Sequence, residues 1–115
     1  MIYDSMGGMH PAPLPDLARC AIHTFTTKPL DLRQAVAAYR AAGVDGISVW
    51  REHLEPYGAA EAARILADHG MTVPAFVRGG FFTGDAAARS AAIDANKQML
   101  DQAATIGAEA MVLVV

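Results

Sequence analysis

The feature that most constrains the fold is a repeated order of elements in which a glycine stands at each joint. Gly43, Gly70 and Gly107 each follow a stretch with apolar residues at helical spacing, and each precedes a short link and an apolar run. Glycine is typical of this position because it adopts the left-handed conformation that ends a helix. Alternating helices and apolar strands predict an α/β protein with a parallel sheet, either doubly wound or a (β/α)8 barrel.

The apolar runs and helical patterns give approximate bounds for each element. The predicted strands cover residues 19–26, 44–50, 72–77 and 111–115, and the predicted helices cover residues 32–42, 59–69 and 85–106. Asp31 and Gln34 form a capping box before the first helix. Pro74 weakens the third strand, since proline cannot donate to a sheet ladder. The residues expected to face inward from the third helix are Ile93, Leu100, Ala103 and Ala104. The strands do not alternate strictly with polar residues, so both sheet faces are expected to be buried.

The number of elements predicts part of a barrel. A complete (β/α)8 barrel needs about 250 residues, whereas this chain has 115 residues, four predicted strands and three predicted helices. We interpret residues 19–115 as the N-terminal half of a TIM barrel, and residues 1–18, rich in Gly, Met and Pro, as an extended or disordered arm. An open half-barrel exposes two strand edges. We therefore expect that the chain continues beyond Val115 or that the half-barrel pairs with another chain.

Composition and charge limit the classes of binding partner that the chain is expected to have. The net charge of -3, without a Lys/Arg run, gives little support for nucleic-acid binding. No apolar run approaches the ~20 residues of a membrane span, and the N-terminus lacks the basic region of a secretory signal. The single cysteine, Cys20, fits a reducing cytoplasm and is expected to be a buried structural thiol. We expect a cytoplasmic protein with a small-molecule partner and no membrane or nucleic-acid partner; a homo-oligomer is compatible with this.

Polar side chains follow the predicted strands, at the edge where parallel α/β proteins bind ligands. The clearest stretch is residues 46–53, which passes from an apolar strand into Trp50, Arg51, Glu52 and His53. Trp50 is a candidate wall against the apolar face of a ligand ring, or equally a core aromatic. Arg51 and Arg78 could hold a phosphate or carboxylate, because a guanidinium is a bidentate donor, or they could form ion pairs.

Four further residues lie in the first predicted strand or follow the third. His23 could donate to a substrate hydroxyl, or be a packed histidine. Gly79 and Gly80 permit close backbone approach or form a simple turn. Phe81 could belong to a lid, an interface or the core. The candidate substrate-binding residues are His23, Trp50, Arg51, Arg78 and Phe81.

Catalytic residues cannot be assigned from these elements. Catalysis by proton transfer needs a base, an acid and a group that stabilises the developing negative charge. Glu52 is the one nearby acid, with Glu55 a little further along, while Asp45 and Glu109 belong to the opposite face. His and acidic residues form no cluster with metal-ligand spacing. We therefore expect no metal ligands here and no catalysis by this segment alone.

Three stretches carry a resemblance to a known family: AIHTFTTKP at 21–29, GISVWR at 46–51 and RGGFF at 78–82. They resemble the N-terminal half of the sugar phosphate isomerase/epimerase family, in the xylose isomerase-like TIM barrel superfamily. The resemblance covers about residues 19–115. It implies a metal-dependent enzyme that moves a proton between adjacent carbons of a sugar-like substrate, with a divalent metal such as Mn, Mg, Co or Zn. In that family the metal ligands and acid/base carboxylates come mainly from later strands. The alternatives are a non-catalytic half-barrel that assembles with another chain, a dehydratase, or an endonuclease of the same superfamily.

Overall fold

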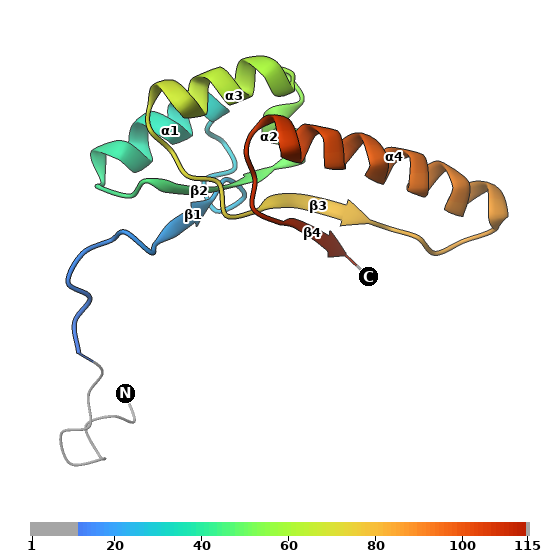
Figure 1. The fold of residues 1–115 in the computed structure, drawn as a ribbon, viewed down its shortest axis with the longest axis horizontal. Coiled ribbons are helices and arrows are strands. Elements are labelled where there is room, and N and C mark those ends of the chain that lie inside the picture. Colours follow the sequence, from blue (N-terminus) through green and yellow to red (C-terminus); the bar gives the residue numbers. More distant parts are fainter. Residues whose placement is uncertain (1–11, 115) are drawn as a thin grey trace, which may run out of the picture.

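The computed structural model describes residues 12–114, which form one four-stranded parallel sheet with helices on one side (Figure 1). The strands are β1 (Ala21–His23), β2 (Gly46–Trp50), β3 (Phe76–Gly80) and β4 (Met111–Val114). The helices are α1 (Leu32–Ala41), α2 (Arg51–Leu54), α3 (Ala59–Asp68) and α4 (Ala86–Thr105). The strands lie in sequence order, and every neighbouring pair is parallel. A doubly wound sheet carries helices on both faces, so this arrangement is part of a barrel.

The described part of the N-terminal arm lies away from the sheet. Residues 12–18 are exposed and contain no helix or strand. The prediction for residues 1–11 lies outside the described residues, and the boundary between residues 18 and 19 stays a prediction. Cys20, expected to be buried, is only half-buried, because it stands at the open start of β1.

The first long helix follows from its sequence as predicted. Asp31 accepts a hydrogen bond from Gln34 N at 2.8 Å, and the Gln34 side chain accepts one from Asp31 N at 2.9 Å. The buried side of α1 packs into the core between the helices and the sheet. The apolar residues of this core are Leu32, Ala35, Val36, Tyr39, Ile47, Val49, Leu54, Ala62, Ile65, Leu66, Val73, Phe76, Met99, Ala103 and Ile106. This layer of helices over β2 and β3 positions the carboxyl ends of the strands.

Three predicted strands have different bounds in the structure, and the second begins at Gly46 rather than at residue 44. The first ends at His23 because consecutive turns follow it, with Leu30 N donating to Thr27 O at 2.9 Å. The third begins at Phe76, after Pro74, while Thr72 forms only an isolated bridge with Gly46. That strand continues through residues 78–80, beyond its predicted end at residue 77. The short helix α2 was also missed.

The prediction of which face of α4 points inward was wrong at three of four residues. Ile93 and Leu100 are 46% and 54% exposed, and Ala104 is exposed, whereas Ala103 is buried as expected. The inner face instead carries Asn96, Met99 and Ala103. The amide of Asn96 bonds both backbone groups of Gly80 in β3, and these bonds fix the rotation of the helix about its axis.

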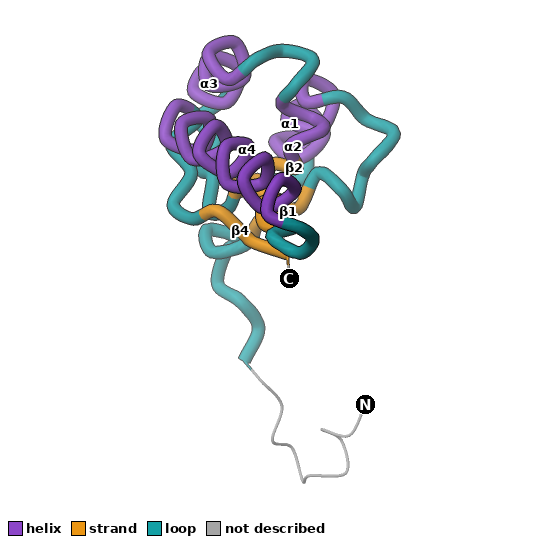
Figure 2. Tube along the Cα trace, turned by 90° about the vertical axis from the view of Figure 1, so that its right-hand side faces the viewer, coloured by secondary structure: helices purple, strands orange, loops and turns teal. Residues whose placement is uncertain are grey.

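The face of the sheet opposite the helices is open in the described part of the chain. Figure 2 shows the helices gathered on one side, with β4 at the margin of the sheet. Val112 and Leu113 on β4 are exposed, so the expectation of two buried faces was wrong there. No helix among residues 12–114 is long and apolar enough to cross a membrane.

Candidate functional site

Trp50 is the centre of the candidate site. It is the last residue of β2, and its backbone N donates to the Thr24 hydroxyl at 2.8 Å. Thr24 is fully buried, and its own N donates to Ser48 O at 2.9 Å. These two bonds join the end of β1 to the end of β2. The ring of Phe25 then meets the Trp50 ring edge-on, with centroids 4.7 Å apart.

A cavity of about 410 Å³ lies beside Trp50, and we call it the strand-end cavity. Its lining residues are His23, Phe25, Thr26, Trp50, Val77 and Arg78. They come from β1, β2 and β3 and the turn after β1, at the carboxyl ends of the strands. Three of the five candidate residues, His23, Trp50 and Arg78, are therefore brought together here.

Arg78 owes its position to an irregularity in β3. The pairing register with β4 shifts between Val77 and Gly79, so Arg78 is an extra residue in the ladder. Adjacent strand residues normally point to opposite faces, but a bulge re-aims a side chain, and here both Val77 and Arg78 line the cavity. The guanidinium carbon lies 6.0 Å from the Trp50 ring centroid and 5.2 Å from that of Phe81. No residue within 12–114 forms an ion pair with it.

His23 offers a hydrogen-bond donor to the cavity. Its Nδ1 accepts from Phe25 N at 2.9 Å, so the neutral ring carries its hydrogen on Nε2. Burial lowers the pKa of His23 below its ordinary value of 6.5, and the nearby His53 lowers it further. Both causes favour the neutral ring, whose Nε2–H can donate to a hydroxyl.

The other two candidate residues lie outside the strand-end cavity. Arg51 begins α2, and its Nε lies 2.8 Å from Glu55 Oε1, which matches the ion-pair interpretation. Phe81 follows β3, is half exposed, and touches the site only through Arg78. It lines a separate hollow of about 300 Å³ with Phe82 and Val114.

The two glycines before Phe81 provide close approach rather than a simple turn. A Cβ on Gly79 would lie 2.4 Å from Asn96 Oδ1, and one on Gly80 would lie 2.2 Å from Val114 O. Gly80 also has a φ of 101°, in the region that favours glycine. These glycines let β3 pass between α4 and β4 and so carry Arg78 to the cavity.

Sequence reasoning missed several residues that shape the site. Thr24 and Phe25 belong to a turn, whereas the prediction placed them in the first strand. Lys28 is exposed, and its Nζ lies 5.5 Å from the ring centroids of both Phe25 and Trp50. Thr24 and Phe25 directly follow His23 in the AIHTFTTKP stretch, and this proximity to a candidate residue could have indicated that they belong to the site.

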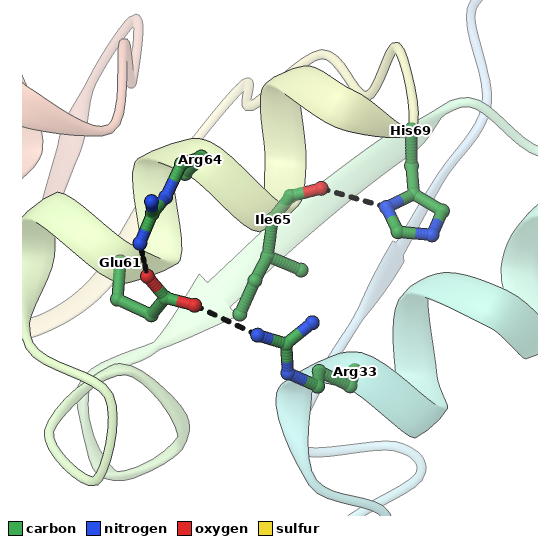
Figure 3. A network of polar contacts seen from close by, with 5 residues as sticks. All are labelled: Arg33, Glu61, Arg64, Ile65 and His69. Carbon is green, nitrogen blue, oxygen red and sulfur yellow. Dashed lines mark hydrogen bonds and ion pairs between the residues drawn. The ribbon is translucent and has the colours of Figure 1, made fainter.

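The acidic groups are placed away from the strand-end cavity. Asp45 pairs with Arg40 at the start of β2. Glu61 pairs with Arg64 and, at 2.7 Å, with Arg33, in a network on α1 and α3 that Figure 3 shows. His69, predicted at a helix end, lies there with Nδ1 2.8 Å from Ile65 O. Residues 12–114 contain no group of three or more His, Cys, Asp or Glu side chains that could hold a metal ion.

Comparison with known proteins bears on the fold. Neither a protein-family model nor a curated protein matches the chain significantly. The solved structure of protein SMc04130 from Sinorhizobium meliloti 1021 matches with a TM-score of 0.78 and 35% identity, over 83% of this chain and 35% of that one. A xylose isomerase-like TIM barrel/4-hydroxyphenylpyruvate dioxygenase fusion protein matches with a TM-score of 0.68 and 21% identity, over 81% of this chain and 15% of that one.

Fold and comparisons agree on half of a TIM barrel. Four consecutive parallel strands with helices on one side confirm the predicted α/β fold class. The likeness to the xylose isomerase-like TIM barrel fusion protein, at 21% identity, bears on the fold alone, and that fold is a TIM barrel. This chain spans about a third of the length of the Sinorhizobium protein that it matches.

Proposed function

We propose that the chain is part of a cytoplasmic, metal-dependent sugar or sugar-phosphate isomerase or epimerase, and that the strand-end cavity holds its substrate. The observation that carries the proposal is the convergence of His23, Trp50 and Arg78 on one cavity. That cavity lies at the carboxyl ends of parallel strands, where TIM-barrel enzymes bind and transform their substrates. Its volume of about 410 Å³ suits a small molecule.

Each of the three side chains has a distinct part in binding. The Trp50 ring supplies an apolar wall for the carbon-bound face of a sugar. His23 donates from Nε2 to a hydroxyl. Arg78 is the only charged residue among the described residues that line the cavity, and its guanidinium suits a phosphate or carboxylate of the substrate.

The proton-transfer step needs groups that residues 12–114 do not bring to the cavity. Among residues 12–114 no carboxylate lines the cavity, and the His and acidic side chains of this range do not fit a metal centre. We therefore assign no catalytic step and no metal ligand to these residues. The divalent metal and the acid/base carboxylates of the proposed enzyme belong to other parts of the barrel.

Binding can be tested through the single tryptophan of the chain. The indole signal of Trp50 is followed by NMR while D-ribose 5-phosphate or D-ribose is added. Arg78→Met is expected to weaken binding of the phosphate about tenfold or more, as loss of a charge-assisted hydrogen bond requires, and to change D-ribose binding little. Arg64→Met is the matched control, because Arg64 pairs with Glu61 on the outer helices. Equal phosphate affinity in Arg78→Met and Arg64→Met would contradict the assignment.

The chemistry needs a complete barrel. Residues 20–114 can be joined to the remaining part of the Sinorhizobium protein that they match. The chimera and that parent protein are incubated in D₂O with Mn²⁺ and a panel of aldoses, ketoses and their phosphates. Metal-dependent exchange of a carbon-bound proton next to the carbonyl supports the proposal. Absence of exchange in the chimera, with or without activity in the parent, would overturn it.

A second candidate function is assembly of the half-barrel with a second copy of itself. It is favoured by the exposed Val112 and Leu113 on β4, since β4 pairs only with β3 and β1 only with β2 among the described strands. A mass near twice 12.1 kDa in light scattering supports this candidate, and a stable species at 12.1 kDa refutes it.

A further inference from the structure

Phe81 has a backbone conformation that a phenylalanine seldom adopts. Its φ is 63°, in the left-handed region, and it is the only residue other than glycine with a positive φ among residues 12–114. The Cβ of an L-residue is crowded against the following carbonyl oxygen in this region, so bulky side chains are rare there. Strained residues persist only where the surrounding structure fixes them, and they are concentrated at functional sites. The contacts of the Phe81 ring are therefore of interest.

Hydrogen bonds to two other elements fix this strained backbone. Phe81 N donates to Val114 O of β4 at 3.2 Å. The preceding residue, Gly80, is held through both of its backbone groups by the side-chain amide of Asn96 on α4. The chain therefore leaves β3 along a path that β4 and α4 define, and this path brings the Phe81 ring to Arg78.

The ring of Phe81 lies against the guanidinium of Arg78. The guanidinium carbon is 5.2 Å from the Phe81 ring centroid, closer than the 6.0 Å that separates it from the Trp50 centroid. Both distances are within the ~6 Å at which the face of an aromatic ring attracts a cation. Phe81 is also 50% exposed, so the packing of a buried core does not account for its strained backbone.

Contacts of this kind prepare an arginine to bind an anion. Arg78 is exposed, and no ion pair with a residue in the range 12–114 holds it. A long side chain that is otherwise free loses much conformational entropy when it binds a ligand. Contact with a ring face restricts the guanidinium in advance and leaves the N–H donors at the edge of its plane open to a phosphate or carboxylate.

We propose that Phe81 is a positioning residue for the anion-binding arginine of the strand-end cavity. Its ring holds the Arg78 guanidinium beside Trp50, so that the N–H donors face the cavity before the anionic group of a ligand arrives. The left-handed backbone at Phe81 persists because it places the ring there. This inference rests on the proposed function, since it takes Arg78 as the group that binds the anionic part of the substrate.

Substitutions at Phe81 in the full 115-residue chain separate positioning from a structural role. Phe81→Gly removes the ring and relieves the backbone, because glycine adopts the left-handed conformation freely. We expect its urea midpoint to equal or exceed that of the wild type. Its affinity for D-ribose 5-phosphate should fall about two- to fivefold, as the loss of an exposed cation–π contact requires. Phe81→Tyr retains the ring and should retain the wild-type affinity.

Two NMR signals follow these effects. The indole N–H of Trp50 reports binding of D-ribose 5-phosphate. The Nε–H of Arg78 reports the position of the guanidinium without any ligand, because a proton over the face of an aromatic ring is shielded. The Arg78 signal is expected to move downfield in Phe81→Gly and to stay in place in Phe81→Tyr. Phe82→Leu is the matched control and should change neither signal, since Phe82 is the adjacent residue, is 37% exposed and does not line the strand-end cavity.

The outcomes distinguish this inference from the proposed function. If Arg78→Met and Arg64→Met bind D-ribose 5-phosphate equally well, or the wild type does not bind it at about 0.1 M, both are overturned. If Arg78→Met weakens binding but Phe81→Gly binds as Phe82→Leu does, the anion site stands and only the positioning role is overturned. A Phe81→Gly protein that unfolds at lower urea than the wild type, or fails to fold, would show that the ring supports the fold and would also overturn the positioning role.

Discussion

Replacing Asn96 by alanine should destabilise the fold markedly, although the residue lies on a helix far along the chain from the strand that it supports. Its side chain is 8% exposed. Oδ1 accepts from Gly80 N at 2.7 Å, and Nδ2 donates to Gly80 O at 2.9 Å and to Ala92 O at 2.7 Å. The amide thus joins α4 to the end of β3 through both backbone groups of one glycine.

The size of the effect follows from those bonds. Each intramolecular hydrogen bond contributes about 0.5–1.5 kcal/mol net, and a buried group left without a partner costs about 1–3 kcal/mol. Gly80 is buried, and in Asn96→Ala its N–H and C=O lose the side-chain amide that bonds both of them. We expect a loss of about 2–4 kcal/mol from a free energy of unfolding that is typically about 5–15 kcal/mol.

Urea denaturation followed by the fluorescence of Trp50 measures this loss. Lys97→Ala is the matched control, because Lys97 is the exposed next residue on α4. Asn96→Asp offers a second check, since its carboxylate would place an oxygen against Gly80 O, and stability should partly return when acid protonates that group. A difference below about 0.5 kcal/mol between Asn96→Ala and Lys97→Ala would refute the reasoning.

Four further substitutions have defined outcomes. Burial lowers the pKa of His23, so the unfolded chain binds the proton more readily and stability should fall as the pH drops below 6.5; His23→Gln should flatten this dependence in urea titrations across that range. Thr24→Val removes the buried hydroxyl that accepts from Trp50 N, and should cost about 1–3 kcal/mol of unfolding free energy by the same assay. Met99→Ala in the core should cost about 2–5 kcal/mol, whereas exposed Leu100→Gln should change thermal stability by less than about 0.5 kcal/mol.

The order of helices and strands could be predicted because residues close together in the sequence mark where each helix begins and ends. Gly43, Gly70 and Gly107 have φ values of 79°, 64° and 74°, so each adopts the left-handed conformation that the helix ends require. The capping box at Asp31 needs only residues within one turn of each other. Signals of this kind depend on a few neighbouring residues, so they can be recognised without knowledge of the tertiary contacts.

The face of α4 and the start of β3 could not be predicted, because both depend on partners distant in sequence. Ile93 and Leu100 are apolar and suit an inward face by composition, but the bonds between Asn96 and Gly80 turn them outward. An asparagine is not expected on the buried, apolar face of a helix unless the hydrogen-bond partner of its amide is known. The sequence does not show that partner, since the pairing joins a strand and a helix sixteen positions apart.

The two arginines of the candidate site show how the same local pattern leads to different places. Each arginine directly follows an apolar strand residue, so the sequence predicts the same environment for both. After Trp50 the backbone turns directly into α2, and Arg51 therefore lies on a helix, where Glu55 one turn later pairs with it. At Val77 the strand instead continues with a bulge, and Arg78 remains among the strand ends beside Trp50. An arginine reaches the strand-end cavity only where the backbone stays extended past it, so the choice between ion pair and anion site is made by backbone geometry rather than by residue type.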